Sequence, residues 1–240
     1  MLMTILAMMT LSVADDGAVC CGRCPPVNNG GWLLCGLPTA PGVVGNKEDL
    51  VSVYDIRTNK VLSDKKFHCE VNEIKWNTTG DLFFATTGDG TVKVLTYPEL
   101  KEVGPALPGH TANCISLSFD PKGKYFATGS ADTLINLWSA TELICIRTFG
   151  QSEWPCRNLS FSYDGQLIAY SSDDTFLKLT YVETGEVVHK ISADTTYCVA
   201  WNPKELILAF AGNEKAPYSG GGGGGRGDSS GGVVIRIFGQ

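Results

Sequence analysis

The chain has 240 residues and 43% apolar side chains, which suits one large β domain or two small ones and argues against global disorder. The net charge of −6 and the pI of about 5.1 argue against a protein that grips nucleic acid by itself, because neutralising phosphates needs a basic surface. The acidic balance favours basic or protein partners. No apolar run reaches the length needed to span a membrane.

Residues 1–42 do not follow the pattern of the rest and are interpreted as an unstructured leader or a misjudged start of the coding sequence. A secretory signal peptide is the alternative, because residues 1–14 are apolar and end in small residues, but no basic residue precedes them. The leader also holds a C-x-x-C pattern among Cys20, Cys21, Cys24 and Cys35. Adjacent cysteines rarely serve one zinc ion and no histidine lies nearby, so no metal ligands and no cofactor are predicted.

The other cysteines each lie in or beside a strand-like run without regular pairing. They are Cys69, Cys114, Cys145, Cys156 and Cys198. An odd total of nine, scattered in this way, indicates buried reduced thiols of a cytosolic or nuclear protein.

From residue 43 the chain becomes regular, and residues 43–240 are predicted to form one repeating β unit after another. Val51 and Val53 alternate with polar residues before Tyr54-Asp55, which indicates the last strand of a unit. The two strands that should precede it are expected to be absent.

Four aromatic residues end strands at a constant period. They are Trp76, Phe119, Phe161 and Trp201, with spacings of 43, 42 and 40 residues by subtraction. Each is followed by a turn rich in Asn, Asp, Ser, Pro or Gly, and Asp89, Asp132 and Asp174 recur in the next turn. Internal similarity at this period is the strongest signal in the sequence and indicates a repeat architecture.

Residues 109–138 are the most complete unit. Residues 113–119 alternate apolar and polar side chains, which predicts a half-buried strand; residues 125–129 and 134–138 follow as a second and a third strand after turns. The last unit is interrupted at 215–232 by a six-glycine run, interpreted as a flexible surface loop. An integrin ligand at Arg226-Gly227-Asp228 would need an extracellular setting and is not favoured.

The unit from Gly109-His110 to Trp138 resembles a WD repeat, so the chain is identified as all-β, a WD-repeat β-propeller. The resemblance assigns the family's structural tetrad to His110, Thr128, Asp132 and Trp138. The types suit a chain of hydrogen bonds, because Asp accepts from the imidazole, His reaches the hydroxyl and the indole can only donate. A hydrolase triad is the alternative, but no Gly-x-Ser-x-Gly context is present.

The family usually has seven blades of four strands, and this chain accounts for about five. In the family, a last blade of three strands takes its fourth strand from the N-terminus, which closes the ring. Here the expectation is an open arc of about five blades with exposed ends, whose last blade holds three strands. A truncated gene model is the alternative.

Several phrases after residue 70 resemble the WD-repeat subunit family of the THO complex, among them residues 71–76, 97–100, 154–157 and 199–204. The resemblance implies a nuclear, non-enzymatic scaffold that couples transcription to messenger RNA packaging and export. Its implied partners are other THO subunits and, through them, a DEAD-box RNA helicase and messenger RNA. A generic WD-repeat adaptor, either a ubiquitin-ligase substrate receptor or a histone-tail reader, is the alternative. A propeller enzyme is disfavoured, because the three histidines lie far apart in the repeat.

A partner surface is predicted at Glu153, Trp154, Arg157 and Asp173, in loops that lie on one face of a propeller. An exposed Trp beside Arg has the composition of a binding hot spot. The alternative is that Trp154 packs between blades.

Overall fold

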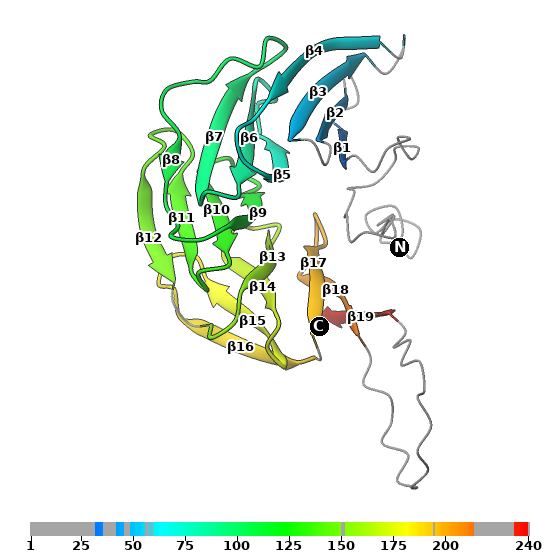
Figure 1. Cartoon of the computed structure of the whole chain (residues 1–240). Helices are drawn as coiled ribbons and strands as arrows, with labels where there is room; N and C mark the ends of the chain where they lie inside the picture. The colour runs from blue at the N-terminus through cyan, green and yellow to red at the C-terminus, as the bar shows by residue number, and fades with distance from the viewer. Residues whose placement is uncertain are drawn as a thin grey trace, which may run out of the picture.

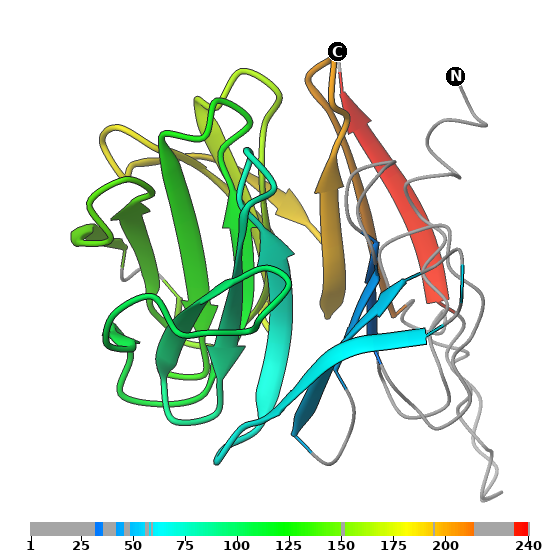
Figure 2. The same cartoon turned by 90° about the horizontal axis from the view of Figure 1, so that it is seen from above.

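The computed structural model describes residues 32–35, 42–45, 49–55, 58, 60–149, 152–193, 195–213 and 233–239. Its strands form five antiparallel sheets that follow one another along an arc (Figure 1). Seen from above, most strands run in roughly one common direction (Figure 2). The described residues contain no helix, and none could therefore be long and apolar enough to cross a membrane.

The first three sheets follow the chain in order. The first holds β1 (Trp32–Cys35), β2 (Gly42–Gly45), β3 (Leu50–Asp55) and β4 (Lys60–Lys66). The second holds β5 (Val71–Trp76), β6 (Leu82–Thr87), β7 (Thr91–Thr96) and β8 (Leu107–Pro108). The third holds β9 (Cys114–Phe119), β10 (Tyr125–Ser130), β11 (Ile135–Ser139) and β12 (Cys145–Phe149).

The last two sheets complete the arc. The fourth holds β13 (Cys156–Phe161), β14 (Leu167–Ser172), β15 (Phe176–Tyr181) and β16 (Val187–Ser192). The fifth holds β17 (Thr196–Trp201), β18 (Ile207–Asn213) and β19 (Val233–Gly239), three strands as the sequence predicts. The strands β5, β9, β13 and β17 lie side by side along the inner edge of the arc.

The expectation that two strands are missing before residues 50–55 is wrong. The strands β1 and β2 precede β3, pair with each other and extend the sheet to four strands. Each is only four residues long and they are separated by Gly and Pro, which hides an alternating pattern. The boundary predicted between residues 42 and 43 therefore falls inside the first sheet. The rest of the leader and residues 215–232 lie outside the described residues.

The core consists of four apolar clusters, one between each pair of consecutive sheets. Central strands serve two clusters at once: in β10, Phe126 faces the second sheet and Ala127 faces the fourth. Successive side chains of β9 alternate in the same way, and both Ser116 and Leu117 are fully buried. The predicted half-buried strand is thus buried on both faces, because each sheet is sandwiched between two others.

Side chains also tie the inner strands to one another. Glu73 Oε2 accepts the Leu117 N–H at 2.6 Å, and Asn158 Oδ1 accepts the Val199 N–H at 3.0 Å. Both acceptors occupy the third position of their strand. The same position of the repeat therefore supplies a side chain that bonds one inner strand to the next. Ser116 occupies that position in β9, and its buried hydroxyl has no hydrogen-bond partner among the described residues.

The cysteines from Cys69 to Cys198 are all free thiols. Cys114 and Cys156 are buried, as the sequence predicts, and burial is the main cause that raises the pKa of both thiols. Cys145 is exposed, contrary to the expectation, because the outer strand β12 lies on the rim of the arc.

Candidate functional site

Two sets of loops meet at one end of the sheets. The antiparallel order places the loop before each inner strand at the same end as the loop between the second and third strands. Contacts between the two sets follow: Gly88 N–H donates to Glu70 O, and Ala131 N–H donates to Asn113 O, at 2.8 and 2.9 Å. All of the sequence-predicted site residues lie at this end or on the strands that enter it.

The structure brings His110, Thr128, Asp132 and Trp138 together in the third sheet. His110 Nδ1 lies 3.1 Å from Asp132 Oδ2, and its Nε2 lies 2.8 Å from Thr128 Oγ1. Trp138 Nε1 donates to the same hydroxyl oxygen at 2.9 Å. The indole can only donate, so the hydroxyl hydrogen is free to go to the histidine. These four residues form one continuous chain from the surface turn to the interior.

The chain of bonds fixes the protonation state of His110. With its proton on Nδ1, the imidazole donates to Asp132 and accepts the Thr128 hydroxyl through Nε2. Burial lowers the pKa of His110 and outweighs the opposing effect of Asp132. Burial would raise the pKa of Asp132, but hydrogen bonds from the Thr111 and Leu134 N–H groups, with His110, lower it. The pair is therefore a neutral imidazole beside a carboxylate at neutral pH.

Acidification is expected to destabilise the protein between pH 7.5 and 5.5. The pKa of His110 is lowered in the folded state from its ordinary 6.5, so the unfolded chain binds the proton more readily and stability falls as the pH drops. Urea unfolding at both pH values measures the loss. His110→Asn should flatten the pH dependence, whereas the exposed His68→Asn should keep it. Equal unfolding midpoints for the parent protein at both pH values would contradict this interpretation.

Sequence reasoning missed Asn136, which completes the network. It is 2% exposed, its Nδ2 donates to Gly109 O, and its Oδ1 accepts the Thr148 hydroxyl at 2.7 Å. The signal that could have found it is a single polar residue inside the apolar strand of residues 135–138. Asn136 ties the loop before His110 to the outer part of the same sheet.

The neighbouring sheets fill the corresponding place differently. In the second sheet Phe67, Ala85 and Leu95 pack together as part of the apolar core. In the fourth sheet a nearly buried Lys178 forms an ion pair with Asp174 at 3.1 Å. Among the described residues, the hydrogen-bonded chain is thus specific to the third sheet.

The tetrad does not have the geometry of a hydrolase triad. Thr128 is 0% exposed and its oxygen already accepts a hydrogen bond from an indole, so it cannot reach a substrate. Among the described residues, no group of three or more His, Cys, Asp or Glu side chains could hold a metal ion. What the arrangement can do chemically is hold two loops and two strands in register.

The predicted partner surface lies in the fourth sheet and the loop before it. Trp154 is 50% exposed, so half of its surface faces away from the core. Arg157 donates from Nε and Nη2 to the two carboxylate oxygens of Asp173, at 3.2 and 2.8 Å. Those two contacts hold the guanidinium in one orientation. Glu153, which precedes Trp154 in the chain, is exposed.

The matches to known protein families fall on the repeating units described above. Residues 59–95 and 101–139 match the family described as WD domain, G-beta repeat, and residues 148–204 match the Anaphase-promoting complex subunit 4 WD40 domain. This chain belongs to the WD-repeat family. The five sheets are five blades of a WD-repeat β-propeller, and the all-β fold with an incomplete ring, predicted from the repeat period, is confirmed.

The chain is similar to several WD-repeat relatives. THO complex subunit 3 of Arabidopsis thaliana is 49% identical over 175 residues, which cover 72% of this chain and 55% of the relative. WD repeat-containing protein AAC3 of Dictyostelium discoideum is 34% identical over 175 residues, covering 70% of this chain and 36% of that protein. This WD-repeat chain thus spans about half the length of the first relative. The resemblance to the THO subunit family seen in the sequence is confirmed.

Proposed function

We propose that this WD-repeat protein is a non-enzymatic scaffold subunit of a THO-type complex in the nucleus. The observation that carries the proposal is the 49% identity to THO complex subunit 3 over 175 residues. That match covers 72% of this chain, whereas AAC3 is 34% identical over the same length. Its partners would be other THO subunits and, through them, a DEAD-box RNA helicase and messenger RNA.

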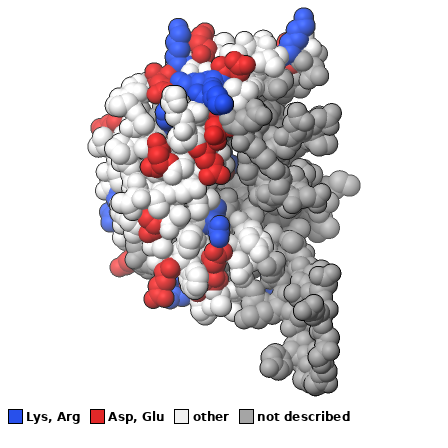
Figure 3. Space-filling model, in the orientation of Figure 1, with Lys and Arg blue, Asp and Glu red and all other residues white. Residues whose placement is uncertain are grey.

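The distribution of charge supports indirect contact with RNA. Acidic side chains are scattered over the visible face of the described residues among fewer basic ones (Figure 3). With a net charge of −6, the chain offers phosphates little attraction, so partners would supply the RNA contact. In this role the protein couples transcription to packaging and export of messenger RNA by holding other proteins together.

The contact surface is proposed at Glu153, Trp154, Arg157 and Asp173. A half-exposed indole next to a guanidinium fixed by a carboxylate combines a large apolar contact with a preorganised polar one. The tetrad lies elsewhere, in the interior of the third blade, and would support this surface only by keeping the loops in register.

Affinity purification of the tagged chain from nuclear extract of its own organism tests the proposal. Mass spectrometry is expected to recover THO subunits with the parent protein and fewer of them with Trp154→Ala. The matched control is Tyr163→Ala, which removes an aromatic side chain that is 40% exposed at the other end of the same sheet. Recovery of ubiquitin-ligase components or histones in place of THO subunits would favour a generic adaptor. A purification without THO subunits would refute the assignment.

A further inference from the structure

The indole of Trp154 is more exposed than those of Trp76, Trp138 and Trp201. Trp138 and Trp201 are 3% and 7% exposed, whereas Trp154 is 50% exposed. Its loop is held locally, since the Trp154 N–H donates to Ser152 Oγ at 3.3 Å. A large aromatic side chain in a short, braced loop is suited to bind a partner at small entropic cost.

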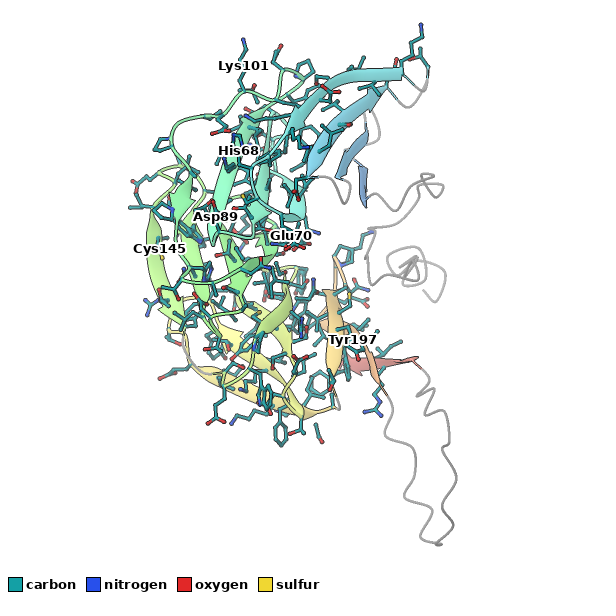
Figure 4. All side chains as sticks on the ribbon, in the orientation of Figure 1. His68, Glu70, Asp89, Lys101, Cys145 and Tyr197 are labelled. Carbon is teal, nitrogen blue, oxygen red and sulfur yellow. The ribbon has the colours of Figure 1, made fainter. Side chains whose placement is uncertain are left out.

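The loops at the end of the sheets that carries Trp154 are rich in carboxylates. The name "acidic end" is used here for two sets of loops: those before each inner strand, and those joining the second and third strands of each sheet. Its described loop residues include no lysine or arginine, and their carboxylates are Asp49, Glu70, Asp89, Asp132, Glu153, Asp173 and Asp174. Glu70 and Asp89 come from two such loops of the second blade (Figure 4). The loops at the opposite end mix both signs, with Lys101, Lys122, Lys124 and Lys204.

Two basic residues on strands that enter the acidic end, Arg157 and Lys178, are each paired with a carboxylate. Arg157 is held by both oxygens of Asp173, and Lys178 is paired with Asp174. Neither cation therefore offsets the remaining carboxylates. Tyr197 of β17, at the strand position of Arg157 in the next blade, adds a second aromatic ring that is 44% exposed.

We infer that the acidic end binds an extended, lysine- and arginine-containing segment of a partner protein, with Trp154 as its anchor. The aliphatic stem of a basic side chain would cover the indole while its cation lies over the ring and pairs with Glu153. A negatively charged segment or an RNA strand would meet repulsion from the same carboxylates. This inference rests on the proposed scaffold function and specifies the chemistry of the partner.

Fluorescence anisotropy of the full chain with three labelled probes tests it. The probes are a short peptide of lysine, arginine and alanine, its counterpart with glutamate at every basic position, and an oligouridine of equal length. The basic peptide is expected to bind, and more weakly as salt rises. Trp154→Ala should weaken binding about fivefold or more, the loss typical of an interface anchor. Glu153→Lys should weaken it as well.

The matched control is Tyr163→Ala, in the turn between β13 and β14 at the opposite end, which should bind like the parent. Circular dichroism confirms that each variant is folded. The inference is overturned if the glutamate peptide or oligouridine binds as tightly as the basic peptide, or if Trp154→Ala leaves the affinity unchanged. If the protein recovers THO subunits but does not bind the basic peptide, this inference is refuted and the scaffold function stands. Peptide binding without THO subunits would refute the scaffold assignment alone.

Discussion

Replacing Thr128 by valine is expected to lower the free energy of unfolding by about 3 kcal/mol, although the two side chains have nearly the same shape. Thr128 is fully buried, and its oxygen accepts from Trp138 Nε1 while its hydroxyl lies 2.8 Å from His110 Nε2. Valine leaves a buried donor and a buried acceptor without this partner, and each costs about 1–3 kcal/mol. Urea unfolding of the full chain measures the loss.

The control is Ser116→Ala in the adjacent strand β9. Ser116 is as buried as Thr128, but its hydroxyl has no hydrogen-bond partner among the described residues. Removing a hydroxyl that makes no hydrogen bond is expected to change the free energy of unfolding by less than about 0.5 kcal/mol, or to raise it. If both variants unfold at the same urea concentration, burial of a hydroxyl alone decides the cost, and the tetrad has no structural role.

The repeat period predicts the blades because every unit must bury the same faces against its neighbours. Trp76, Phe119, Phe161 and Trp201 each end an inner strand, as their spacing indicates. The short strands β1 and β2 could not be predicted, since four residues between glycines and prolines show too little alternation. Their place is decided by pairing with β3, a contact that depends on the rest of the blade.

The candidate site follows from sequence only in part. Types and order suffice to assign His110, Thr128, Asp132 and Trp138 to a hydrogen-bonded chain. The role of Asn136 depends on a carbonyl 27 residues away, which no local pattern reveals. The pairing of Arg157 with Asp173 likewise depends on β13 and β14 lying side by side. Contacts across strands, rather than within them, limit what can be predicted.

Gly90→Ala is expected to destabilise the protein by about 2–5 kcal/mol, because two separate costs fall on one residue. Gly90 has a φ of +82°, where an L side chain costs about 1–2 kcal/mol. A Cβ would also lie 2.5 Å from His110 O and 2.8 Å from Ala112 O, and relieving such overpacking costs about 1–3 kcal/mol. Because both oxygens belong to the loop that carries His110, the substitution should separate the second blade from the third.

Gly104→Ala isolates the backbone cost from the contact cost. Gly104 has a similar φ of +75°, but a Cβ there would meet nothing within 4 Å. It should therefore lose only about 1–2 kcal/mol, the conformational part. The difference between the two variants in urea unfolding measures how tightly the turn of the second blade fits the loop of the third. Equal losses would mean that this loop moves aside freely, and His110 would then owe its position to Asp132 and Thr128 alone.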